Sequence, residues 1–172
     1  MTLADFTSRD LLVPRLRGQD TAGVIQELSQ AMHRENRLPA LLPFYHALLN
    51  REFLVSIEME AGIAFPHARL PGLKELSFAL GRSHQPLAWA AKAPRSVRLV
   101  FLIAIPATDS SQYLSLISGL ARLARVERLV EKLHAANDAF QILEVLQQVN
   151  LRSSRPNSTD TAHTLWAKLS KA

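Results

Sequence analysis

The stretch "VRLVFLIAI", Val97–Ile105, decides the fold because Arg98 is its one polar residue. Its apolar residues occupy both alternating faces, as expected for a central strand that helices cover on each side. The run is far shorter than the roughly 20 residues that cross a bilayer, and Pro106 ends it. We therefore expect the middle strand of a sheet between two helical layers.

Amphipathic helices are predicted on both sides of this strand in the sequence. Residues 21–35 and the segment from Pro39 to Glu52 carry apolar residues at helical spacing. Downstream, Ser110 is a candidate cap for a helix whose apolar stripe includes Tyr113. Two further helices are expected at Val126–His134 and, after a cap at Asp138, at Ala139–Val149.

Shorter segments before Val97 favour strands. Residues 53–57, "FLVSI", are strand-like, and residues 76–81 alternate with a period of two. Helices first, strands in the middle and helices last predict an α/β domain with a sheet between helical layers. We place this single domain at residues 1–150. Residues 151–172 are predicted to be a polar linker and a short basic tail, with a helix or a frayed end at "AHTLWAKLSKA".

Composition excludes several classes of protein. The 172 residues are 48% hydrophobic and 20% charged, which is ordinary for a globular chain, and no cysteine is available for disulfides or thiolate metal sites. The N-terminus "MTLADFTSRD" does not resemble a secretory signal, so we expect a cytoplasmic protein without a membrane segment.

The formal charge of +5 is concentrated near the C-terminus. Residues 151–172 carry four basic residues and one acidic residue, a net +3, which leaves +2 for the other 150 residues. No aromatic residues interleave with basic ones, so nucleic-acid binding is not expected. The alternative, nucleic-acid binding by the tail alone, predicts a salt-sensitive affinity that disappears when residues 151–172 are deleted.

Standard catalytic and metal-binding motifs are absent from the sequence. There is no GxxxxGK[ST], GxGxxG, GxSxG or HExxH pattern. None of the six histidines has another at i+3 or i+4, so we expect no metal and no cofactor; they are His33, His46, His67, His84, His134 and His163.

One histidine stands in an unusual setting, the stretch "GIAFPHARLPGL" at residues 62–73. We interpret "GIAF" as a strand and "LPGL" as a turn, with His67 between them. Pro66 stiffens the segment, which suits a nucleophile, and a neutral imidazole has a lone pair that can attack phosphorus. The alternative is a structural histidine.

The sequence "GIAFPHARLPG" resembles the active-site segment of type 2 enzyme IIA domains of the bacterial phosphoenolpyruvate-dependent phosphotransferase system. This family includes the mannitol/fructose and nitrogen-regulatory proteins. The resemblance extends to "LLNRE" upstream, "VRLVFLIAIPA" in the central strand and "YLSLISGLARL" downstream, about residues 10–150. It implies a single three-layer α/β domain with a mixed central sheet flanked by helices on both faces.

The resemblance also implies roles for individual residues. His67 would accept a phosphoryl group from an HPr-like carrier protein, and Arg51 and Ser56 would bind the phosphate. Arg51 could instead be a solvated arginine at a helix end, with Glu52 as its partner. Family members commonly have a second histidine where this chain has Tyr113, whose hydroxyl can donate a hydrogen bond but cannot supply an imidazolium charge. Tyr113 is otherwise a core aromatic residue.

A second departure from the family lies just before this segment. The family usually has Ser-Thr-Gly and a glycine-containing loop where this chain has "SIEMEAG", so Ile57, Glu58 and Glu60 replace small or hydroxyl residues. Carboxylates that face His67 would repel a phosphoryl dianion or raise the imidazole's pKa.

Two functional hypotheses follow. The first is a phosphocarrier, a phosphotransferase component that passes the group to an enzyme IIB or signals by its phosphorylation state, with the nitrogen-regulatory type favoured. The alternative is a regulatory protein-binding module that keeps the enzyme IIA fold without transferring phosphate.

Overall fold

A computed structural model describes residues 1–54, 58–59, 62–89, 96–108 and 111–151. Its centre is a mixed six-stranded sheet with the order β1-β5-β6-β3-β2, in which β4 also pairs with β6. This confirms the predicted fold class. The strands are β1 (Leu12–Val13), β2 (Glu58–Met59), β3 (Ile63–Ala64), β4 (His67–Leu70), β5 (Ser77–Leu87) and β6 (Val97–Pro106).

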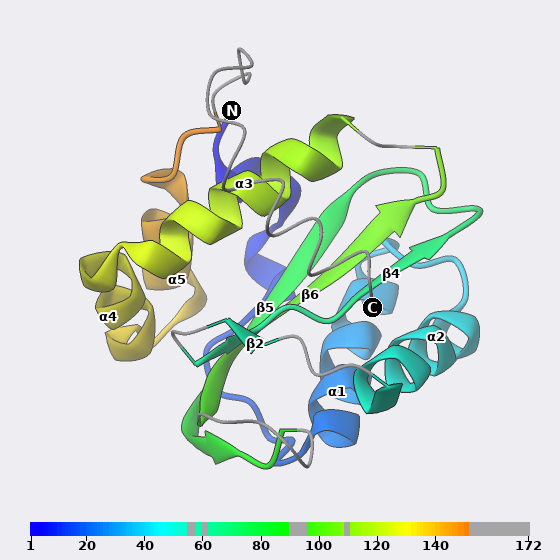
Figure 1. The fold of residues 1–172 in the computed structure, drawn as a ribbon, viewed down its shortest axis with the longest axis horizontal. Coiled ribbons are helices and arrows are strands. Elements are labelled where there is room, and N and C mark those ends of the chain that lie inside the picture. Colours follow the sequence, from blue (N-terminus) through cyan, green and yellow to red (C-terminus); the bar gives the residue numbers. More distant parts are fainter. Residues whose placement is uncertain (55–57, 60–61, 90–95, 109–110, 152–172) are drawn as a thin grey trace.

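Helices cover both faces of this sheet (Figure 1). Helices α1 and α2 lie on one side, and α3, α4 and α5 lie on the other with the first of two short 3₁₀ turns near the N-terminus. Leu11 of the second turn packs in the cluster on the α1–α2 side. No helix in the described part of the chain is both long enough and apolar enough to span a bilayer. The helices are α1 (Thr21–Arg34), α2 (Leu41–Leu54), α3 (Ser111–Arg125), α4 (Glu127–Ala135) and α5 (Ala139–Gln147), and the 3₁₀ turns are Leu3–Phe6 and Arg9–Leu11.

Strand β6 is the middle of the core, as its apolar sequence predicts. It pairs antiparallel with β5 on one edge and parallel with β3 and β4 on the other. Its side chains alternate between two buried clusters: Phe101 and Ile103 pack toward α3–α5, whereas Val100 and Leu102 pack toward α1 and α2. Both faces of the strand are therefore buried.

Two local predictions were wrong. Phe53 and Leu54, expected to start a strand, belong to the end of α2, and residues 55–57 lie outside the described residues. His67, expected between a strand and a turn, is the first residue of strand β4. Both errors have the same cause, because short apolar runs do not distinguish helix, strand and loop by periodicity. The proposed cap Ser110 also lies outside the described residues.

A proline divides the chain that pairs with the second edge of β6. Ile63 pairs with Leu99 in β3, and His67 pairs with Ile103 in β4. Pro66 lies between the two strands and cannot donate a backbone hydrogen bond, but its carbonyl accepts one from Ile103 N at 2.9 Å. The segment therefore stays against β6, and His67 begins a strand on a fixed backbone.

Gly62 makes the turn into β3 possible. Its φ of +70° lies in the left-handed region, and a Cβ there would come within 2.6 Å of the Ser96 carbonyl oxygen. Its own carbonyl accepts a hydrogen bond from Arg98 N at 3.1 Å. Glycine is required here by both conformation and space.

The two ends of the described domain lie side by side. Leu3 N donates to Val149 O at 3.1 Å, and Leu151 N donates to Met1 O at 2.8 Å. Leu151 is buried in the core cluster on the α3–α5 side. The predicted domain boundary at residue 150 stays a prediction. The predicted linker and tail beyond it lie outside the described residues.

Arg82 on β5 forms side-chain hydrogen bonds that connect the sheet to helix α4. Its side chain is 5% exposed, and its Nε donates to the carbonyl of His134 in the last turn of α4 at 2.7 Å, a bond that Nη2 supplements. Nη1 lies 3.2 Å from both Pro14 O and His84 Nε2. One guanidinium thus connects β5 with α4 and with the segment after β1.

This arginine cluster predicts a loss of stability in acid. Desolvation, followed by the charges of Arg98 and Arg82, lowers the pKa of His134 below 6.5. Below about pH 6.5 the unfolded chain therefore binds more protons than the folded one, so the free energy of unfolding decreases as pH falls toward the lowered pKa. Above about pH 6.5 His134 is neutral in both the folded and the unfolded chain, so its full contribution to the free energy of unfolding is present. Urea unfolding at pH 7.5 and 5.5 should show this decrease.

The variant His134→Gln isolates this contribution. It should show a smaller difference in unfolding free energy between the two pH values than the wild type. His46→Gln, which changes an exposed histidine on α2, should behave like the wild type. An unchanged difference in His134→Gln would contradict the assignment.

Candidate functional site

The candidate site lies where β4 meets the start of α3. Ala68 packs in the cluster on the α1–α2 side, so the alternation of a strand turns the neighbouring side chains of His67 and Arg69 toward α3. Tyr113, in the first turn of α3, packs on that same side. The topology therefore brings the predicted nucleophile and the predicted Tyr113 together.

The His67 ring is held in one orientation. Its Nδ1 lies 2.9 Å from the carbonyl oxygen of Phe65. Since a carbonyl only accepts hydrogen bonds, Nδ1 carries the proton and Nε2 carries the lone pair. The residue is 4% exposed, so the ring lies beneath the surface rather than openly at the rim of the sheet.

Tyr113 is a buried neighbour of this ring. The centroids of the His67 and Tyr113 rings are 6.5 Å apart, with an angle of 41° between the ring planes. Tyr113 is 3% exposed and belongs to the core cluster. Tyr113 therefore packs in the core beside His67, and a hydrogen-bonding role of its hydroxyl at the site stays a prediction.

Arg69 supplies a positive charge that sequence reasoning missed. Its Cζ lies 5.6 Å from the centroid of the Tyr113 ring, and its Nη1 donates to the carbonyl of Pro106 at 3.1 Å. Arg69 is exposed, unlike the two rings. Reading residues 67–70 as a strand would have found it, because residues i and i+2 share a face.

The remaining predicted phosphate ligands cannot be placed at the site. Arg51 lies in the last turn of α2, a helix that contacts β4, but its side chain and that of Glu52 lie outside the described residues. Ser56, Ile57 and Glu60 lie outside them entirely. The backbone of Glu58 pairs with Ala64 in β3, and nothing is described of its side chain. Within the described residues, no three acidic or histidine side chains are arranged to hold a metal ion.

Comparison with known proteins identifies the class to which this fold and site belong. Residues 5–149 match the family "Phosphoenolpyruvate-dependent sugar phosphotransferase system, EIIA 2", so the chain belongs to the type 2 enzyme IIA family. A nitrogen regulatory protein from Bradyrhizobium diazoefficiens is 29% identical over 146 residues, which cover 85% of this chain and 95% of that protein.

Multidomain transporters contain a similar segment. The 2-O-alpha-mannosyl-D-glycerate-specific EIIABC component of Escherichia coli K12 is 30% identical over 111 residues, 64% of this chain. The matched segment spans only 17% of that transporter. Sequence similarity thus links the chain to one segment of a much longer protein.

Solved structures share the fold. The nitrogen regulatory protein IIA-Ntr from Neisseria meningitidis superposes with a TM-score of 0.72 at 22% identity, covering 84% of this chain and 98% of that one. The mannitol IIA protein of Escherichia coli, solved in complex with phosphorylated IIB, gives 0.67 at 15% identity, with 81% and 95% covered. At these identities the likeness concerns the fold.

Proposed function

We propose that this protein is a phosphocarrier that accepts a phosphoryl group on Nε2 of His67. The donor is an HPr-like phosphohistidine protein, and the acceptor is an enzyme IIB or a regulatory target. The hydrogen bond from Nδ1 to the Phe65 carbonyl carries this proposal, because it leaves the lone pair on Nε2. Membership of the enzyme IIA family supports it. The full-length similarity to a nitrogen regulatory protein favours a regulatory role.

The proposed transfer needs no proton movement at His67. The Nε2 lone pair attacks phosphorus, a new N–P bond forms, and the N–P bond to the donor histidine breaks with its electron pair returning to the donor nitrogen. The proton stays on Nδ1 throughout and remains hydrogen-bonded to the Phe65 carbonyl. Catalysis then depends on alignment and on positive charge near the phosphoryl oxygens, as in phosphoryl transfer generally.

The chain is proposed to exchange this group with proteins of the phosphotransferase system in the cytoplasm. The Escherichia coli mannitol IIA protein was solved with a phosphorylated IIB, which supports an acceptor of that class. A cytoplasmic location agrees with a sequence that has no cysteine to form disulfides.

The burial of His67 favours a second candidate, a regulatory module that no longer transfers phosphate. With 4% of His67 exposed, little of the residue's surface is open to a donor protein. A module of this kind would act through protein contacts alone. The two candidates therefore differ in one observable property, the ability to become phosphorylated.

The experiment incubates the full chain with phosphoenolpyruvate, enzyme I and the HPr-type carrier of the same organism. A phosphocarrier should gain the mass of one phosphate, and the modification should be labile in acid. A chain that stays unmodified while the carrier itself becomes phosphorylated would support the regulatory module instead.

Arg69 is predicted to assist this transfer. Because it is a cation near Tyr113 and shares the face of β4 with His67, Arg69→Gln should lower kcat/KM for phosphoryl acceptance by roughly tenfold. Arg69→Lys keeps the charge and should lose less. Arg125→Gln, at the exposed far end of α3, is the matched control and should leave kcat/KM unchanged. Equal kcat/KM values for Arg69→Gln and the control would show that Arg69 does not assist phosphoryl transfer.

A further inference from the structure

A second feature of the fold lies at the opposite edge of the sheet from His67. A groove of about 700 Å³ runs between α1 and the segment that connects β1 to α1. Three arginines line it, Arg15 and Arg17 from the connecting segment and Arg34 from the last turn of α1. Strands β5 and β6 separate β1 from β4, so this groove is distinct from the candidate phosphorylation site.

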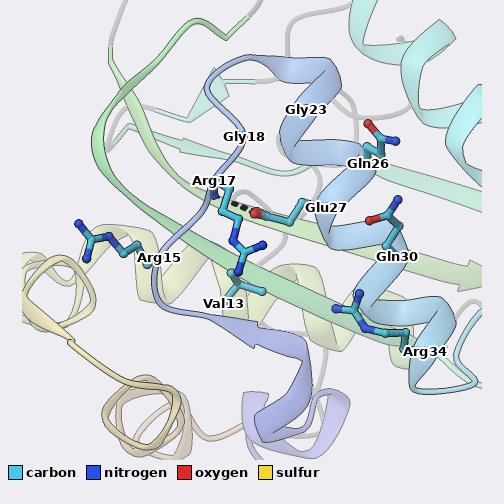
Figure 2. Close-up of a pocket in the computed structure, with 9 residues that line it drawn as sticks. All are labelled: Val13, Arg15, Arg17, Gly18, Gly23, Gln26, Glu27, Gln30 and Arg34. Atoms are coloured by element: carbon cyan, nitrogen blue, oxygen red, sulfur yellow. Dashed lines mark hydrogen bonds between the residues drawn. The ribbon is translucent and has the colours of Figure 1, made fainter.

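One wall of the groove is a polar stripe of α1. Gln26, Gln30 and Arg34 are spaced four residues apart and therefore project from one face of the helix. All three are exposed. Figure 2 shows Arg17 on the connecting segment opposite this stripe, with Arg15 farther along the same segment. Amide and guanidinium donors thus line both walls.

The Glu27 carboxylate, which lines the groove, already accepts hydrogen bonds from the backbone. Both oxygens of Glu27 accept hydrogen bonds from Arg17 N, at 2.8 and 3.0 Å, as the dashed line in Figure 2 marks. In the part of the chain that the structure describes, none of the three guanidinium groups makes an ion pair or a hydrogen bond. The groove therefore has a net charge of +2 and several donors that lack a protein acceptor.

The connecting segment packs closely against the first turn of α1 where Gly18 meets Gly23. A Cβ on Gly18 would come within 2.6 Å of the backbone of Gly23, so the segment can approach the first turn of α1 only without a side chain there. The bond to Glu27 then fixes Arg17 on this segment. The cationic groups are displayed from a defined backbone, which reduces the entropy lost on binding a ligand.

We propose that this groove binds a small polyanion, a molecule with several phosphate or carboxylate groups. Guanidinium groups bind both kinds of oxyanion through paired hydrogen bonds. Arg17 and Arg34 come from the two walls of the groove rather than from one point, which fits separated anionic groups, and Arg15 extends from the same connecting segment as Arg17 (Figure 2). The volume is within the roughly 300–1,000 Å³ typical of small-molecule sites.

A neighbouring histidine provides a reporter for this site. Desolvation and then the charges of Arg82, Arg15 and Arg98 lower the pKa of His84. An anion bound beside Arg15 opposes that repulsion, so it should raise the pKa of His84. His84 itself does not line the groove, and its ring can be followed by NMR.

The test titrates the full chain with inorganic pyrophosphate and, separately, with citrate, at constant ionic strength. Calorimetry should show saturable binding of one equivalent of at least one of them, and the two arms show which oxyanion is preferred. Arg17→Gln and Arg34→Gln should each weaken binding by about tenfold. The pKa of His84 should rise on saturation.

Two control variants separate this site from others. Arg125→Gln removes an exposed arginine outside the groove, and His67→Gln removes the proposed phosphoryl acceptor; both should bind the probe with wild-type affinity. Absence of saturable binding by both probes would overturn the proposal. So would an equal loss of affinity in Arg125→Gln and Arg34→Gln, which would indicate general charge attraction.

Discussion

His67→Gln should lower phosphoryl acceptance by at least about 1,000-fold, an order-of-magnitude bound for a lost nucleophile, because the lone pair of an amide nitrogen is delocalised into its carbonyl and does not attack phosphorus. The readout is the mass gain on incubation with phosphoenolpyruvate, enzyme I and the HPr-type carrier. The glutamine amide can still donate a hydrogen bond in place of the Nδ1 proton that reaches the Phe65 carbonyl. The fold should therefore persist.

Two controls make this result interpretable. His46→Gln changes an exposed histidine on α2 and should be phosphorylated like the wild type. Thermal unfolding of His67→Gln should show a cooperative transition, which would exclude loss of structure as the cause. Phosphorylation of a folded His67→Gln variant would identify another acceptor and refute the assignment.

Arg82→Gln should reduce the free energy of unfolding by about 3 kcal/mol, because it leaves two half-buried backbone acceptors without their donors. The carbonyls of His134 and Pro14 both accept from this guanidinium, and the arginine is 5% exposed. A shorter glutamine cannot reach both. Urea unfolding at pH 7.5 measures the difference between the variant and the wild type.

The surface variant Arg125→Gln gives the reference for this measurement and should change the free energy of unfolding by no more than about 0.5 kcal/mol. Folded Arg82→Gln should still accept phosphate, because β5 and β6 separate the β1 edge, which Arg82 ties down through Pro14, from the strand that carries His67. A change below about 0.5 kcal/mol in Arg82→Gln would mean that its bonds contribute little to stability.

The sequence was sufficient to predict the central layers of the fold. The apolar run at Val97–Ile105 predicted a strand buried on both faces, and it is the middle strand β6. Helical spacing likewise predicted the helices that cover the sheet, and Asp138 caps α5 by accepting a hydrogen bond from Gln141 N at 2.8 Å. These elements are long, and each has one clear period.

The short elements were not predictable in the same way. Strand β1 has two residues, and β4 has four, of which two are buried and two are not. Such lengths show no period, and their pairing with β5 and β6 involves residues distant in the sequence. Because residues 67–69 were read as a connection between a strand and a turn, Arg69 was not recognised as a neighbour of the site.

The basic groove shows a different limit of sequence reasoning. A net charge of +2 over the first 150 residues gives no sign of a local cluster. Arg34 is separated from Arg15 and Arg17 in sequence, and only the packing of α1 beside the connecting segment brings them to one groove. The positions of the arginines in the folded chain, rather than the total charge of the sequence, identify the basic groove.

The central claim is that Nε2 of His67 is the phosphorylated atom, and its most direct test is the linkage in the phosphorylated protein. NMR of the phosphorylated chain, through coupling between phosphorus and the imidazole ring, distinguishes the two nitrogens. The account predicts a phosphoryl group on Nε2, with the proton retained on Nδ1 beside Phe65 O. A phosphoryl group on Nδ1, or on any other residue, would contradict it.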